Sequence, residues 1–260
     1  MSDIGFKDLV KNTDIKKGDI VDVSSDLRRI ILYCRKSKEP LSPDELLNSV
    51  QEAVSEAGTV LIRTWNWDFC HGIPFDYYKT PSRVGALGNI ALRRKDFIRT
   101  HHPLYSYAVW GKYSKDLFEL NNVSAFGPDS PFGFLTGHHG KQLMLGSTMY
   151  NSFTYVHYVE EQTGVSYRFL KPFTCGYTDE TGKTEIKTYT MNVRKLELNI
   201  KMTSEKFIED FQNAGALKTW DYGDLSVSTV DLASSYPIVE NDILHNCSRK
   251  ICSYNGQGGA

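Results

Sequence analysis

The order of strand-like and helix-like segments over residues 18–63 constrains the fold more than any other feature of this sequence. Gly18–Val23, Arg29–Tyr33 and Thr59–Arg63 are short segments rich in apolar and β-branched residues, which predicts strands. Leu41–Val54 predicts a helix, because a serine stands at a capping position, a proline follows it, and apolar residues recur at helical spacing. This alternation is typical of an α/β sheet with helices packed against its faces.

The second half of the sequence contains a different pattern. Tyr167–Tyr177 and Glu185–Leu198 have the composition of strands, and the turn-forming sequence Asp179–Gly182 separates them. This pattern predicts an antiparallel β-hairpin over residues 166–200. Neither an internal repeat nor a linker composition interrupts the sequence, so we expect residues 1–260 to form a single domain from which the hairpin extends.

Composition and charge argue against several classes of protein. The net charge is −1 and the basic residues are scattered, so a nucleic-acid-binding role is not expected. The first residues lack a signal-peptide pattern and no apolar run approaches membrane-spanning length, which predicts a cytoplasmic protein without a membrane partner. Five cysteines without a Cys-x-x-Cys pair predict reduced thiols. The adjacent pairs His101–His102 and His138–His139 lack the spacing of a metal chelate, so no metal site is expected.

Three polar residues at intervals of three, Thr154, His157 and Glu160, form the strongest candidate catalytic pattern. Positions three apart share one face of a helix, so the hydroxyl, imidazole and carboxylate are expected to converge there. A carboxylate that binds one ring nitrogen fixes the tautomer of a histidine and prepares the other nitrogen to accept a proton. Glu161, at the next position, is an alternative partner. A histidine among tyrosines and valines is also often only a hydrogen-bonded core residue.

The segment Thr64–Lys79 is long, irregular and rich in aromatic residues, including Trp65, Trp67 and Phe69. Long irregular loops inside a compact domain usually have a function, so this segment is a candidate binding wall. The sequence Thr80-Pro81-Ser82 follows, and predicts a helix that starts there and continues to about Arg94.

An ordered series of motifs in this sequence resembles the aminoglycoside 3-N-acetyltransferase family over roughly residues 10 to 165. The series consists of Ser24-Ser25, Gly58-Thr59, Thr80–Leu87, Arg99–Pro103, Ser106, Gly111, Ser130-Pro131, Leu145-Gly146 and Thr154-x-x-His157-x-x-Glu160. The resemblance implies an acyl-CoA-dependent N-acyltransferase with a three-layer α/β/α fold and a mixed central sheet, unrelated to the GNAT acetyltransferases. The fold expected here is therefore α/β with an antiparallel hairpin extension.

The resemblance also implies roles for individual residues. His157 would act as general base and Glu160 would orient it, because an amine that attacks a thioester has to lose a proton. Thr154 or a backbone amide would stabilise the negative charge that grows on the thioester oxygen. The implied contacts of the acyl-CoA, either acetyl-CoA or 3-hydroxybutyryl-CoA, are Ser24, Ser25, Thr80, Ser82, Arg83, Val84, Arg99, His102 and Ser106.

Departures from the family pattern point to the acceptor. Many antibiotic-modifying members have a histidine where this chain has Val23, and a short turn in place of Thr64–Gly72. The region from Tyr167 to Arg194 looks like members associated with lipopolysaccharide O-antigen biosynthesis. Their acceptors are nucleotide-linked amino sugars, such as a dTDP-3-amino-3,6-dideoxyhexose. Such an acceptor fits aromatic stacking and basic contacts to its pyrophosphate, for which the expected residues are Trp65, Trp67, Phe69 and Arg194.

Two alternatives stay open at this point. One is an aminoglycoside 3-N-acetyltransferase of antibiotic resistance, whose polycationic substrate calls for an acidic pocket. The other is a noncatalytic carbohydrate-binding protein on the same fold. The sequence also leaves open the length of the acyl chain, the identity of the sugar and whether the chain forms a homo-oligomer.

Overall fold

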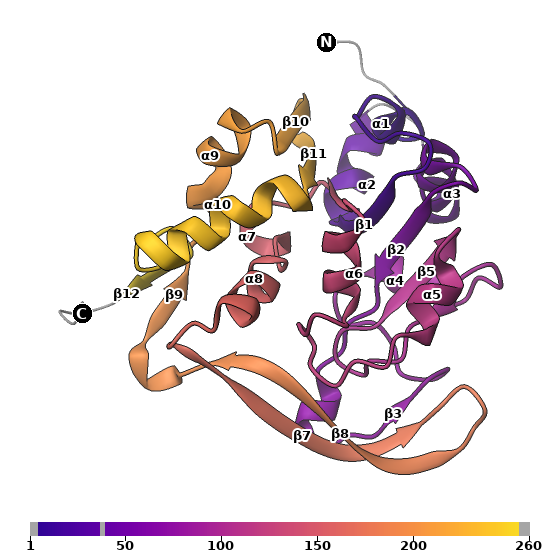
Figure 1. The fold of residues 1–260 in the computed structure, drawn as a ribbon. Coiled ribbons are helices and arrows are strands. Elements are labelled where there is room, and N and C mark those ends of the chain that lie inside the picture. Colours follow the sequence, from indigo (N-terminus) through magenta and orange to yellow (C-terminus); the bar gives the residue numbers. More distant parts are fainter. Residues whose placement is uncertain (1–4, 37–39, 255–260) are drawn as a thin grey trace.

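The computed structural model describes residues 5–36 and 40–254, and a mixed β-sheet forms its centre (Figure 1). Within the described residues this sheet has seven strands, in the spatial order β10-β11-β6-β1-β2-β5-β4. β1 is parallel to β2 and to β6, whereas the outer pairs are antiparallel. The strands are β1 (Ile20–Ser25), β2 (Thr59–Arg63), β4 (Ile98–Arg99), β5 (Tyr107–Gly111), β6 (Lys141–Leu145), β10 (Leu217–Tyr222) and β11 (Leu225–Asp231).

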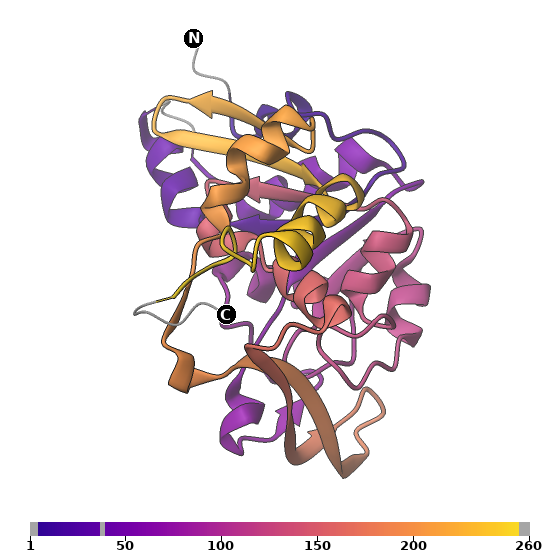
Figure 2. The same cartoon turned by 60° about the vertical axis from the view of Figure 1, so that its left-hand side comes forward.

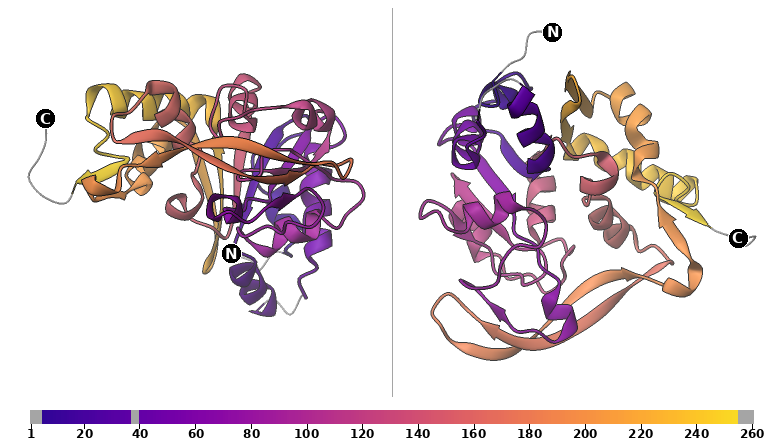
Figure 3. Two further views of the ribbon diagram at one scale, coloured as in Figure 1. Left: turned by 90° about the horizontal axis from the view of Figure 1, so that it is seen from below. Right: turned by 180° about the vertical axis from the view of Figure 1, so that it is seen from behind.

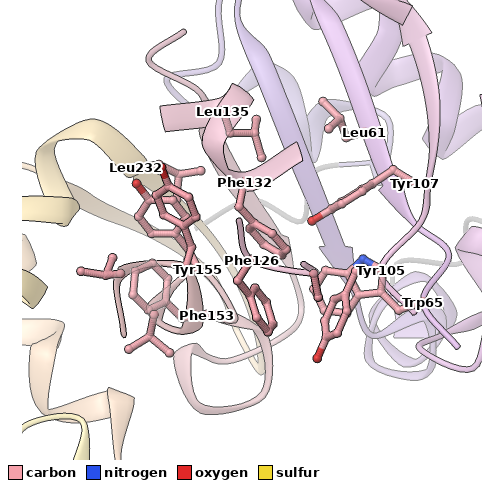
Figure 4. Close-up of a cluster of buried hydrophobic side chains, with 14 of the residues drawn as sticks. Leu61, Trp65, Tyr105, Tyr107, Phe126, Phe132, Leu135, Phe153, Tyr155 and Leu232 are labelled. Carbon is pink, nitrogen blue, oxygen red and sulfur yellow. The ribbon is translucent and has the colours of Figure 1, made fainter. Parts of the chain in front are cut away.

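Helices cover both faces of the sheet and complete a three-layer α/β/α fold (Figure 2). The protein has a hydrophobic core on each face of the sheet. Successive side chains of β2 alternate between them: Val60 and Ile62 belong to one core and Leu61 to the other. The first core includes residues of α1 (Asp8–Lys11), α2 (Leu27–Lys36), α3 (Pro43–Val54) and α4 (Ala86–Ala91). The second includes residues of α5 (Ser114–Glu119), α6 (Pro131–Gly137), α7 (Met149–Ser152), α8 (Val156–Thr163), α9 (Ile208–Asn213) and α10 (Leu232–His245). Figure 4 shows the aromatic part of this second core, where Phe126 and Phe132 lie between Tyr155 and Tyr105.

Three of the four predicted early elements are present and one is wrong. The predicted strand Gly18–Val23 is observed as β1, two residues further along the chain. The strand Thr59–Arg63 is observed as predicted, and helix α3 begins after Ser42, whose Oγ accepts the N–H of Glu45 at 3.3 Å. Arg29–Tyr33, however, lies inside helix α2 and not in a strand. Asp26 Oδ1 accepts two backbone N–H groups of its first turn, and residues 30, 33 and 34 bury one face. The local composition is β-branched, but capping and helical spacing decide the conformation.

The predicted helix start at Thr80 is also wrong. Helix α4 begins only at Ala86, after Gly85, whose φ of 118° is a conformation that glycine adopts at low cost. Thr80 instead accepts the backbone N–H of Asp76 through its hydroxyl (2.8 Å), and the backbone N–H of Ser82 donates to Asn89 Oδ1 (2.9 Å). These side-chain bonds hold the segment before Gly85 in a non-helical path.

The predicted hairpin is present as a long two-stranded ribbon across one end of the molecule (Figure 3). Its strands are β7 (Arg168–Thr178) and β8 (Thr184–Arg194), with Arg168 opposite Arg194 at the base. The short strand β3 (Phe75–Asp76) pairs with β7 and joins the ribbon to the aromatic segment, which also contains the 3-10 turn η1 (Asp68–His71). Beyond the ribbon lie η2 (Leu196–Leu198), β9 (Ile200–Met202), η3 (Ser204–Phe207) and β12 (Cys252–Tyr254).

No helix in the described part of the chain is long and apolar enough to cross a membrane. Residues 5–36 and 40–254 also contain no cluster of histidine, cysteine, aspartate or glutamate that is suited to hold a metal ion.

Candidate active site

His157 and Glu160 form a hydrogen-bonded pair on helix α8. The Nδ1 atom of His157 lies 2.6 Å from Glu160 Oε2. The side chain of His157 is 22% exposed, whereas that of Glu160 is fully buried. Gly164, with a φ of 68°, ends the helix. The pairing of positions three apart, expected from the sequence, is therefore present.

Thr154 does not lie on the helix that carries His157 and Glu160, contrary to the prediction. Helix α8 begins at Val156, so Thr154 lies in the turn before it and not on the same helical face. The N–H of Thr154 donates to Ser152 O (2.8 Å), and its carbonyl accepts the N–H of His157 (2.9 Å). Thr154 nevertheless borders the same cleft as His157, because this tight turn brings both residues to the cleft wall.

The Glu160 carboxylate is held by three partners. Besides His157, Tyr167 donates its hydroxyl to Oε1 (2.9 Å), and Arg168 Nε forms an ion pair with Oε2 (2.7 Å). Burial by itself raises the pKa of Glu160, but His157 and Arg168 outweigh that effect and hold the pKa below its ordinary value. Glu161 points elsewhere, with Oε1 accepting the hydroxyl of Ser124 at 2.5 Å. The structure thus places Glu160, and not Glu161, against the imidazole.

The charge state of Glu160 determines the tautomer of His157. An ionised carboxylate can only accept, so Nδ1 carries the proton and donates it to Glu160. Nε2 is then left with its lone pair. Burial and the positive charge of Arg168 lower the pKa of His157 despite the opposing effect of Glu160, which keeps the ring neutral near pH 7. This arrangement is suited to accept a proton at Nε2.

Two clefts meet at His157. The first cleft, of about 720 Å³, lies at the carboxyl ends of β1, β2 and β6; its walls include Ser24, Ser25, Asp26, Arg28, Arg29, Arg63, Arg83, Val84, Gly146 and Thr154. The second cleft, of about 600 Å³, lies at the base of the hairpin; its walls include Phe126, Arg168, Lys171, Phe173, Met191, Arg194, Leu196 and Glu197. Three residues, Trp67, Tyr105 and His157, line both. A group bound in either cleft therefore has access to the imidazole.

Only part of the predicted acyl-CoA contacts borders a cleft. Ser24, Ser25, Arg83 and Val84 line the first cleft. Thr80, Ser82, Arg99, His102 and Ser106 line neither the first cleft nor the second. For these five residues, the contacts inferred from the family motif are not supported by their positions.

Arg99 illustrates the structural role of these five residues. The side chain is only 3% exposed, and it donates to Ser106 Oγ (3.1 Å) and to the carbonyls of Tyr77 (3.0 Å) and Thr80 (2.6 Å). The guanidinium also lies over the ring of Phe75 at 4.6 Å. Burial lowers the pKa of Arg99 to about 10. Arg99 thus joins the loop after β4 to the segment before α4 and has no surface for a cofactor.

The aromatic segment contributes less to the clefts than predicted. Phe69 is buried against Tyr189 and borders neither of the two clefts, so it is not available for stacking on a ligand. Trp65 is 3% exposed and packs on Tyr105, although it is also one of the residues that line the first cleft. Trp67 is the better placed ring, since it faces both clefts. Arg194 lines the second cleft.

A buried polar network at the wall of the first cleft was not predicted from the sequence. Arg63 donates Nε and Nη2 to the two carboxylate oxygens of Asp22 (2.8 and 2.5 Å), and both residues are almost fully buried. Arg63 Nη1 and Gln142 Nε2 both donate to Ser152 O (2.7 and 2.9 Å), which fixes the turn that precedes Thr154. The available signal was the presence of polar residues within otherwise apolar strands.

Solved structures share the fold. AAC-IIIb in binary complex with CoASH matches with a TM-score of 0.75 at 18% identity, over 94% of this chain and 96% of that chain. Sisomicin-bound AAC-VIa gives 0.76 at 19% identity, over 95% and 98%. The YokD protein from Bacillus subtilis gives 0.73 at 20% identity, over 95% and 94%. No curated protein sequence matches significantly. At these identities the likeness establishes the fold alone.

Family membership comes from the sequence itself. The profile described as aminoglycoside 3-N-acetyltransferase matches residues 23–241. That span contains the residues that line the first cleft, the His157–Glu160 pair and the whole hairpin. The chain belongs to the aminoglycoside 3-N-acetyltransferase family.

Proposed function

We propose that the chain is a single-domain, acyl-CoA-dependent N-acyltransferase in which His157 is the general base. The observation that carries this proposal is the position of the His157–Glu160 pair, whose free Nε2 belongs to a residue that lines two clefts at once. A transferase that brings a donor and an acceptor together needs this geometry, because both reacting groups must reach the same base. The family name and a relative solved with CoASH support an acyl-CoA as the donor.

The reaction follows from the protonation state of His157. Nε2 removes a proton from the acceptor amine as its nitrogen attacks the thioester carbonyl. The new nitrogen–carbon bond forms, the carbon–sulfur bond breaks, and the imidazolium returns the proton to the departing CoA thiolate. Glu160 stabilises the imidazolium without taking its proton. Thr154, in the cleft wall beside His157, is the proposed donor to the thioester oxygen.

The first cleft is the proposed acyl-CoA site. Arg28, Arg29, Arg63 and Arg83 border it together with one carboxylate, Asp26. Three of these arginines are already paired with carboxylates: Arg63 with Asp22, Arg83 with Asp68 (2.9 Å), and Arg28 with Asp26 (3.8 Å). The remaining positive charge of Arg29 favours the phosphates of CoA. Ser24, Ser25 and Val84 complete the proposed contacts, and the acyl group is acetyl or 3-hydroxybutyryl.

The second cleft is the proposed acceptor site, and its charge favours a phosphate-bearing amine. Lys171 and Arg194 border it together with Arg168, whose charge is already paired with Glu160, and with a single carboxylate, Glu197. A neighbouring hollow of about 490 Å³ continues from Arg194 and includes Lys195 and Lys201. A nucleotide-linked amino sugar, such as a dTDP-3-amino-3,6-dideoxyhexose, has a pyrophosphate for these cations and a base that can stack on Trp67.

A second candidate function is aminoglycoside 3-N-acetylation. The family name and the sisomicin-bound relative favour it over the sugar-nucleotide acceptor, which no comparison supports. The charge of the second cleft is the specific observation against it, because a polycationic antibiotic is attracted by carboxylates and Glu197 is the only one in that wall.

The acceptor experiment measures free CoA released with acetyl-CoA and with 3-hydroxybutyryl-CoA. The acceptors are a dTDP-linked 3-amino-3,6-dideoxyhexose, the same sugar without its nucleotide, and kanamycin. We expect the linked sugar to give the highest kcat/KM, and Trp67→Ala to reduce its advantage over the free sugar. Preference for kanamycin would replace the sugar-nucleotide proposal by the antibiotic one. Absence of CoA release with every acceptor would favour the noncatalytic, carbohydrate-binding alternative.

A further inference from the structure

Arg168 connects the base of the hairpin to the catalytic pair. It is the first residue of β7, its side chain is 6% exposed, and its Nε lies 2.7 Å from Glu160 Oε2. His157 Nδ1 lies 2.6 Å from that same oxygen. One carboxylate oxygen therefore interacts with both a guanidinium and an imidazole.

The hairpin itself holds the guanidinium in place. Arg168 Nη1 donates to Asn192 O of β8 (2.9 Å), and Nη2 lies 3.6 Å from the sulfur of Met202 in β9. Tyr167, the preceding residue, binds the other oxygen of Glu160. Because Arg168 is anchored on β8 and Tyr167 adjoins β7, the chain at the base of the ribbon fixes both oxygens of the carboxylate.

We propose that Arg168 is a positioning residue, which holds Glu160 Oε2 in the orientation that accepts the Nδ1–H of His157. The proposal rests on the role of His157 as general base. The base of the hairpin has no part in the proposed reaction steps, so this positioning role is an additional function for it. A planar guanidinium suits this role because it contacts the carboxylate through one edge and the Asn192 carbonyl through another.

Arg168 also affects the proton affinity of His157. The Nη2 atom of Arg168 lies 3.0 Å from His157 Nδ1, which already carries a proton. If the ring gained a second proton, the guanidinium would repel the resulting imidazolium. The charged and titratable groups that face the ring are Glu160 from α8, Arg168 from β7 and Arg194 from β8, with the Tyr105 hydroxyl in the shared cleft wall. Glu160 favours the imidazolium, and both arginines disfavour it. Removal of Arg168 should therefore make His157 more basic.

The test compares Arg168→Met, which removes the charge and the donors, with Arg168→Lys, which keeps a charge but loses the planar fork. We expect Arg168→Met to lower kcat at least about tenfold, because a small displacement of a base is costly. The acid limb of kcat/KM should move to higher pH in this variant. Arg168→Lys should restore the acid limb toward its original position and recover only part of kcat.

Two matched variants separate this role from general effects of the hairpin or of charge. Lys183→Gln changes an exposed residue of the hairpin turn and should leave kcat unchanged. Arg194→Met removes a second cation near the ring that makes no contact with Glu160, so it should raise the KM of the acceptor and change kcat much less.

NMR titration of His157 in the protein without substrates does not depend on acyl transfer. The effect of Arg168 on His157 can therefore be tested even if the proposed reaction is wrong. The titration midpoint should rise in Arg168→Met and stay near that of the unchanged protein in Arg168→Lys. An unchanged midpoint in a folded Arg168→Met protein would overturn the proposal, whatever the effect on kcat. If Arg168→Met does not fold, full kcat in Arg168→Lys would overturn it equally.

Discussion

Acid should destabilise this protein through His102. The ring is 2% exposed, and its Nδ1 accepts the backbone N–H groups of Leu104 and Tyr105 (both 3.3 Å). Nε2 must then carry the proton, which it donates to Val123 O at 3.4 Å. Protonation of Nδ1 would break two hydrogen bonds and place an unpaired charge in the core. Burial accordingly lowers the pKa of His102 to about 3.

The magnitude follows from proton linkage. The unfolded chain binds a proton at this side chain with a pKa of 6.5, whereas the folded protein resists it down to about pH 3. The unfolded state therefore binds more protons between these values, and stability that is present above pH 6.5 is lost as the pH falls. At about 1.4 kcal/mol per pH unit, His102 alone should cost about 2 kcal/mol between pH 7.5 and pH 5.

Urea denaturation at pH 7.5 and pH 5 measures this loss. His102→Asn is the matched variant, because Asn Oδ1 can accept the two N–H groups in place of Nδ1 and does not titrate. Other titrating groups contribute equally to both proteins. We expect the unchanged protein to lose about 2 kcal/mol more than His102→Asn over this pH interval. Equal losses in the two proteins would show that protonation of His102 does not destabilise the fold.

Three further predictions concern other buried charges. Glu160→Gln should lower kcat at least about tenfold in a steady-state assay while Glu161→Gln has little effect; the opposite order would move the orienting role to Glu161. Asp22→Asn should lower the free energy of unfolding by about 3–5 kcal/mol, because it leaves the Arg63 cation unpaired, and adding Arg63→Met should recover part of that loss in urea denaturation. Arg99→Ala should lower the free energy of unfolding by at least about 2 kcal/mol without a selective rise in the KM of acyl-CoA. A selective rise with unchanged stability would instead restore the predicted cofactor contact.

Local signals predicted the elements that depend on neighbouring residues. The Ser42 cap and apolar stripe of α3, the five residues of β2 and the two strands of the hairpin are visible in the sequence because each depends on local spacing. The contact of His157 with Glu160 was predictable for the same reason. Arg29–Tyr33 shows the limit of composition, since a β-branched segment became helical where a cap and one buried face favoured it.

Contacts between distant segments were not predictable from spacing. Even Arg168, only eight residues after Glu160, reaches it because the chain reverses direction after Gly164, and no residue spacing indicates that reversal. Arg99 and His102 lie in the predicted motif Arg99–Pro103, yet both side chains are buried in the interior. The family predicted from the motifs is confirmed by the profile match, whereas the sugar-nucleotide branch depends on the charge of the second cleft and stays a proposal.

The role of His157 as general base can be tested by measuring acyl transfer by His157→Asn together with calorimetric binding of acyl-CoA. We expect at least about a hundredfold loss of kcat with an unchanged Kd for acyl-CoA, the scale expected for removal of a general base. In the unchanged protein, the acid limb of kcat/KM should lie below pH 6.5, because burial and Arg168 lower the pKa of His157 and the neutral ring is the active form. Near-normal turnover by a folded His157→Asn protein would show that His157 is not the general base.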